Sequence, residues 1–291
     1  MKYCLQLLIC LLFFFFNTAF VLSSQNSKSS LQLFPQNRLF LAKIADPREV
    51  QLSARILFNR NEFAGNIGYS VGVLEFNLNR LPIQLRIEGN TLFVSKVRKP
   101  DFPMQSADYT IAFPFDTRIK SFSARLKWTH ISSHLGDDFN RIENVHNSLE
   151  RFGNEYSYFS KPKKFSREFL EIFGSFDRLN NRFYSGLIWA YHITRNRSDD
   201  RPFAPITFQF GYECFNKIQN KVVKPFMAMD AKLKQQFNWQ PDLNLQLGMI
   251  IGTNQLGRMR IALEVYNGFS NQGQFYNRKD KDVNFLLAFD F

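Results

Sequence analysis

The side chains best suited to chemistry in this sequence lie close together in the segment His130-Ile131-Ser132-Ser133-His134. A histidine can take the proton of a serine hydroxyl and make its oxygen a nucleophile, as ester hydrolysis requires. His130 and Ser132 occupy alternate positions, and alternate residues share one face of a β-strand. We therefore take Ser132 as a candidate nucleophile and His130 as its candidate base.

The same segment offers little for a metal ion. His130 and His134 have the spacing of a ligand pair on a helix, but on a strand they are on the order of 13 Å apart, too far for one ion. Asp137 and Asp138 are oxygen donors of the kind that calcium prefers. We predict no metal site and no cofactor, with calcium expected only if the protein is a hydrolase.

These residues end a segment that alternates with the period of a β-strand. From Phe122 to Thr129 one parity carries Phe, Ala, Leu and Trp, and the other carries Ser, Arg, Lys and Thr. An apolar face opposite a basic face is typical of a transmembrane barrel, which has lipid outside and water inside. The parity then places His130, Ser132 and His134 on the lipid-facing side.

The alternation recurs along the chain in about twelve segments, an even count that bacterial barrels allow. The polar connections between segments are alternately short and long, as expected for periplasmic turns and external loops. We therefore predict an all-β protein, a transmembrane antiparallel up-and-down β-barrel of about 12 strands. The segments are centred on residues 50–58, 67–73, 81–87, 109–115, 122–134, 169–176, 183–191, 206–212, 227–233, 243–251, 259–265 and 283–291.

Composition agrees with this class. The 291 residues carry a formal charge of +12 and are 45% hydrophobic, which excludes a disordered chain. The aromatic fraction of 16% fits a barrel with aromatic girdles at the membrane interfaces. After the amino-terminal segment, no apolar run is long enough for a spanning helix. A closed barrel is then the way in which an exported chain can cross a membrane.

The amino terminus predicts export. Lys2, the apolar run Leu5 to Phe16 and a small, polar exit form a signal peptide over residues 1–23. We expect a periplasmic leader over residues 24–47 and an outer-membrane barrel domain over residues 48–291.

The last predicted strand has apolar residues at alternate positions back from Phe291. This resembles the signal by which outer-membrane barrels reach the barrel assembly machinery, so we expect that machinery as a partner. Outer-membrane lipids and lipopolysaccharide are the other expected partners, and the expected location is the bacterial outer membrane. Export makes nucleic acid an unexpected partner despite the positive charge.

The basic face of the strands supports a different function. An open lumen with a net positive charge would make an anion-preferring pore for small solutes. Interleaved carboxylates could instead close the lumen with ion pairs, and at about twelve strands the interior can be filled or open. A non-enzymatic pore or a structural surface protein is therefore the alternative to an enzyme. The predicted lumen-facing residues are Arg86, Arg125, Lys127, Lys232, Lys234, Arg258 and Arg260.

The motif His-x-Ser within the segment 128–134 resembles that of the outer-membrane phospholipase A and lipid A deacylase barrels. The resemblance implies a lipid-facing acyl-ester hydrolase, in which Asn144 would orient His130. Ser133 and His134 stand where those families have Asn and Gly.

A resemblance to one family extends over most of the chain, the uncharacterised bacterial envelope family called domain of unknown function 1207. It implies an outer-membrane barrel and brings no activity, so the sequence leaves open whether the protein is an enzyme. The segments that carry it are Ala45-Asp46-Pro47-Arg48, Ser132-Ser133-His134-Leu135-Gly136-Asp137-Asp138, Ser166-Arg167-Glu168 and Gly211-Tyr212-Glu213.

Overall fold

A computed structural model describes residues 31–78, 81–97, 102–136, 165–194, 204–215, 222–252 and 258–290 of the chain. Among these residues, no helix has the length and apolar character needed to cross a membrane. Two short 3-10 helices, η2 (Gln235–Phe237) and η3 (Gly273–Phe275), lie between strands.

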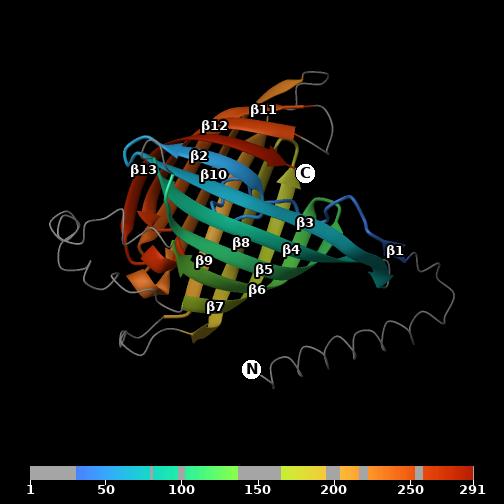
Figure 1. Ribbon diagram of the computed structural model, residues 1–291. Coiled ribbons are helices and arrows are strands. Elements are labelled where there is room, and N and C mark those ends of the chain that lie inside the picture. Colours follow the sequence, from blue (N-terminus) through green and yellow to red (C-terminus); the bar gives the residue numbers. More distant parts are fainter. Residues whose placement is uncertain are drawn as a thin grey trace, which may run out of the picture.

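Twelve long strands of the described residues form one closed antiparallel sheet (Figure 1). Each strand pairs with its neighbours in sequence, and β2 closes the ring by pairing with β13. A two-residue strand, β1 (Gln32–Leu33), pairs with β3 near its end, at Leu74 and Glu75. The strands are β2 (Leu52–Leu57), β3 (Glu62–Leu78), β4 (Leu81–Lys96), β5 (Met104–Ile119), β6 (Phe122–Leu135), β7 (Phe165–Arg178), β8 (Asn181–Thr194), β9 (Ile206–Phe215), β10 (Val223–Lys234), β11 (Pro241–Ile251), β12 (Arg258–Phe269) and β13 (Lys279–Asp290).

The predicted all-β barrel of twelve strands is therefore confirmed. We call the end with the β5–β6 and β7–β8 connections the turn end, and the end with the β6–β7 connection the loop end. The connection between β2 and β3, residues 58–61, lies at the loop end although it is short. Loop length thus alternates less regularly than the sequence suggested. Phe291 lies outside the described residues.

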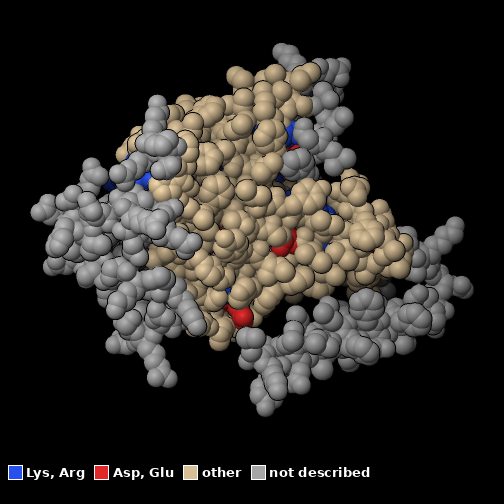
Figure 2. All heavy atoms as spheres, in the orientation of Figure 1, with Lys and Arg blue, Asp and Glu red and all other residues tan. Residues whose placement is uncertain are grey.

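The distribution of polarity is inverted relative to a soluble barrel. Large apolar side chains face outward in mid-strand, with Leu247 65% and Leu263 57% exposed. Charged side chains such as Glu88 and Arg125 are buried inside. Figure 2 shows few charged residues among the described residues on the face that it presents. This arrangement is that of a transmembrane barrel, which turns its apolar face to lipid.

A segment that precedes the first barrel strand lies inside the lumen. Residues 39–51, which we call the plug, are hydrogen-bonded by side chains from several strands of the barrel wall. The amide of Ile44 donates to Glu213 of β9 at 2.9 Å, and Asn244 of β11 donates to the carbonyl of Ala45 at 2.7 Å. Small inward residues such as Ala228 leave space for this segment.

The plug includes residues 39–47 of the segment that we expected to be a periplasmic leader. The boundary at residue 47 stays a prediction, and the structure has residues 39–47 within the ring of strands. The physical reason is that their charged and polar groups find buried partners on the strands, which an exposed leader would not need.

Candidate functional site

The lipid-facing cluster predicted from the sequence lies near the loop end of β6. His130, Ser132 and His134 all point outward, while Ile131 and Ser133 are buried on the lumen side. The Oγ of Ser132 is 2.9 Å from Nε2 of His134, a hydrogen-bonding distance. A serine and a histidine in contact are the minimum arrangement for an activated nucleophile.

The structure pairs Ser132 with His134, whereas the sequence analysis chose His130 as the base. The Nδ1 of His130 instead lies 3.6 Å from a carboxylate oxygen of Glu168 on β7. Both histidines flank Ser132 on the same face of the strand, so their spacing alone could not distinguish them.

Aromatic side chains of neighbouring strands surround this cluster. The ring of His134 packs edge-on against Tyr109 of β5, with 5.6 Å between the centroids. The ring of Trp128 stacks on His130, and its Nε1 donates to the hydroxyl of Tyr191 on β8 at 2.6 Å. Packing of this kind restricts the rotamers of the two histidines.

The predicted orienting residue Asn144 lies outside the described residues, as do Asp137 and Asp138. The part of the chain that the structure describes contains no cluster of histidine, cysteine and acidic residues suited to a metal ion. The metal and cofactor predictions therefore stay predictions.

All seven residues predicted to face the lumen occupy inward positions on their strands. Most of their charges are matched by a carboxylate, so the ion-paired interior is the alternative that these contacts favour. The guanidinium of Arg86 is held by Ser70 and Gln84, and Arg258 has a buried Nε without a hydrogen bond among the described residues. The ion pairs are Arg125–Asp116 (2.7 Å), Lys127–Glu171 (3.2 Å), Lys232–Asp46 (2.5 Å), Lys234–Asp242 (2.5 Å) and Arg260–Asp290 (3.0 Å).

Asp46 is the electrostatic centre of the plug. It lies 2.5 Å from Nζ of Lys232 and 2.9 Å from Nζ of Lys43. Burial alone would raise the pKa of the Asp46 carboxyl, but the two ammonium groups more than offset burial and hold this pKa well below its ordinary value. Burial alone would lower the pKa of Lys43, and Asp46 and neighbouring carboxylates raise it instead. The plug is therefore bound by charged groups.

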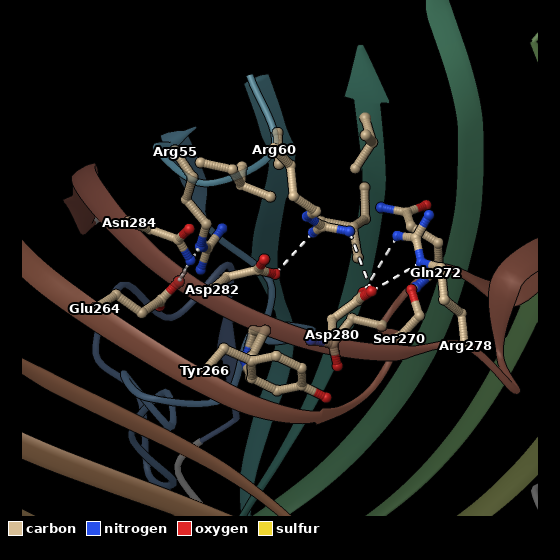
Figure 3. A pocket seen from close by; sticks show the side chains of 16 residues that line it. Arg55, Arg60, Glu264, Tyr266, Ser270, Gln272, Arg278, Asp280, Asp282 and Asn284 are labelled. Carbon is tan, nitrogen blue, oxygen red and sulfur yellow. Dashed lines mark hydrogen bonds and ion pairs between the residues drawn. The ribbon is translucent and has the colours of Figure 1, made fainter. Parts of the chain in front are cut away.

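A second charged network lies between the plug and the β2–β13 wall, around a small cavity of about 50 Å³ (Figure 3). Arg60 donates to Asp280 at 3.1 Å and to Asp282 at 2.7 Å. Arg278 also donates to Asp280, at 2.7 Å. Because arginines already bind both carboxylates, we assign this network to stability of the barrel wall.

Two features of the lumen were not predicted from the sequence. One is the plug, in which the apolar residues Phe40 and Ile44 lie close in sequence to the charged residues Lys43 and Asp46. The other is Arg167, which lies on β7 with its guanidinium toward the lumen cavity. The signal for Arg167 was its inward parity, opposite to that of Glu168.

A family model described as a protein of unknown function (DUF1207) matches residues 16–291. No curated protein matches the sequence. Outer membrane phospholipase A from Escherichia coli, in an active-site mutant, has 10% identity, a TM-score of 0.47 and coverage of 91% of this chain and 95% of its own. The beta domain of the Bordetella autotransporter BrkA has 7% identity, a TM-score of 0.42 and coverage of 83% and 96%. Likeness at this level says nothing of activity.

Proposed function

Because this chain belongs to the DUF1207 family, whose members are described as proteins of unknown function, we propose its role from its own residues. We propose that it is an outer-membrane barrel that hydrolyses acyl esters of membrane lipids at Ser132. The observation that carries the proposal is the 2.9 Å contact between Oγ of Ser132 and Nε2 of His134 on the outer face.

In the proposed reaction, Oγ of Ser132 attacks the ester carbonyl carbon while Nε2 of His134 takes the hydroxyl proton. His134 then gives this proton to the departing alcohol oxygen, which leaves an acyl-serine. A water molecule attacks the acyl-serine with His134 again as the base, and the fatty acid is released. The first step requires the neutral imidazole tautomer that carries its proton on Nδ1.

The surroundings of Ser132 suit a lipid substrate. Tyr109 pairs with Ser132 across the β5–β6 ladder, and Ile111 pairs with His130. Tyr109 is 49% exposed and Ile111 is 44% exposed on the outer face. Acyl chains would contact these side chains while the ester lies beside the hydroxyl. Phospholipid and the acylated sugar of lipopolysaccharide both present such esters.

The pore alternative has weaker support. The plug occupies the lumen, and its Asp46 binds Lys232 of the predicted anion pathway. Solutes would have to pass the plug, which several buried ion pairs hold inside the barrel.

The test is release of fatty acid from phospholipid vesicles by the purified, folded protein. Ser132→Ala should lower kcat/KM on the order of a thousandfold, because nucleophile and base act as a unit. Ser133→Ala is the matched control, since Ser133 is 2% exposed and faces the lumen, and it should leave the activity near that of the wild type. Equal activity in the wild type and Ser132→Ala, or none in the wild type, would remove the proposal.

A further inference from the structure

A cavity of about 140 Å³ lies in the lumen between the plug and the loop end of the barrel. This volume is well above the roughly 15 Å³ that one water needs. Six lysine and arginine side chains but only four carboxylates are among its described lining residues. The cavity is therefore polar, and two of its lining cations, Arg48 and Lys234, have carboxylate partners that lie outside the lining.

Arg167 of β7 is the cation in this lining that forms no ion pair within the described residues. Its Nε and Nη2 are buried, and neither has a hydrogen-bond partner among the described residues. Its guanidinium instead lies 4.6 Å from the ring centroid of Phe165 and 5.5 Å from that of Phe169. Rings cannot replace the hydrogen bonds of a buried guanidinium, and unpaired buried charge is costly.

A serine hydroxyl lies near the guanidinium of Arg167, although Ser133 does not itself line the cavity. The Oγ of Ser133, on β6, is also buried and without a partner within the described part of the chain. A methyl group added to Gly273 would lie 2.0 Å from this Oγ and 2.8 Å from Nη2 of Arg167. The two groups therefore both lie beside Gly273, where a larger side chain would collide with them.

The carboxylate of Asp108 has other hydrogen-bond partners than Arg167. Arg48 of the plug donates to Asp108 at 3.0 Å, and the backbone amide of Gly273 donates to it at 2.9 Å. Asp108 is therefore already paired with a cation, and it accepts no hydrogen bond from Nε or Nη2 of Arg167.

We propose that Arg167 and Ser133 form a binding site for a small oxyanion, a carboxylate or a phosphate, inside the lumen. Nε and Nη2 form one edge of the planar guanidinium fork, which matches two oxygens of such a group in bidentate fashion. The Ser133 hydroxyl donates a further hydrogen bond. This site is separate from Ser132, which lies on the opposite face of β6, so the proposal does not depend on hydrolysis.

The experiment is isothermal titration of the full-length, folded protein in detergent with inorganic phosphate and, separately, with acetate, at constant ionic strength set with sodium chloride. We expect saturable one-site binding of at least one of the two anions. Arg167→Gln should weaken this binding at least tenfold, and Ser133→Ala should weaken it several-fold. Arg258→Gln is the matched control, because it removes a lumen cation at the turn end and should leave binding unchanged.

The outcomes separate the possibilities. Binding of phosphate alone or acetate alone supports the site and assigns its ligand class. Absence of saturable binding by the wild type would overturn the proposal, as would equal affinity in Arg167→Gln and the wild type. If Arg167→Gln loses its heat-modifiable gel shift and is unfolded, Ser133→Ala decides, and wild-type affinity in that variant then overturns the site.

Discussion

His130 and His134 flank Ser132 on one face of β6, and their contacts give them different roles. His134 contacts the serine at 2.9 Å, while His130 faces Glu168. We predict that His134→Ala lowers kcat/KM for fatty-acid release on the order of a thousandfold, because it removes the base. His130→Ala should lower it less than tenfold, as its contact is with Glu168. A larger loss in His130→Ala than in His134→Ala would assign the base to the other histidine.

For these three residues, the sequence predicted which face of the strand they occupy, but not which histidine contacts Ser132. Strand parity alone placed His130, Ser132 and His134 on the outer surface, and the structure agrees. Which histidine bonds to Ser132 depends on side-chain rotamers, and equal spacing on either side of the serine leaves that choice open. Asn144 belongs to a segment without strand periodicity, so no pattern could position it.

The plug is the element whose energetics can be tested most sharply. Asp46→Asn leaves the ammonium groups of Lys232 and Lys43 without their shared carboxylate inside the barrel. We predict a loss of about 3–5 kcal/mol in the free energy of unfolding, the usual cost of removing one partner of a buried ion pair. Urea unfolding of the protein folded in lipid vesicles measures this loss.

Asp177→Asn is the control for that measurement. Asp177 pairs with Arg118 near the turn end, but its side chain is 21% exposed. Removing it should cost less than about 1 kcal/mol, as is usual for partly exposed pairs. If the two variants lose equal stability, the charges of the plug contribute no more than a surface pair.

The sequence could not predict the plug because its contacts are distant along the chain. Ile44 binds Glu213 across 169 positions, and no local pattern joins them. A short polar segment before a strand has the composition of an exposed leader, and only the closed ring of strands gives its charges partners. The strands themselves were predictable, because their alternation is local.

The whole barrel has apolar side chains outside and charged side chains inside, so we expect its outer face to contact lipid. Leu247 lies in the middle of β11 and is 65% exposed. We predict that Leu247→Arg destabilises the protein folded in lipid vesicles, and reduces its free energy of unfolding by about 2–4 kcal/mol. This is the usual cost of arginine at the bilayer midplane. Leu179→Arg, in an exposed turn, should cost at most about 1 kcal/mol. A neutral Leu247→Arg would mean that this face does not meet lipid.

The central claim is that His134 activates Ser132 as a nucleophile on the membrane face. The most direct measurement is covalent labelling by an alkyl fluorophosphonate, with the modified residue identified by mass spectrometry. Ser132 would displace fluoride from phosphorus while its proton passes to His134. We predict a single label on Ser132 in the wild type, and labelling slowed on the order of a thousandfold in His134→Ala. A wild-type Ser132 that stays unlabelled, or equal labelling rates in the two proteins, would contradict it.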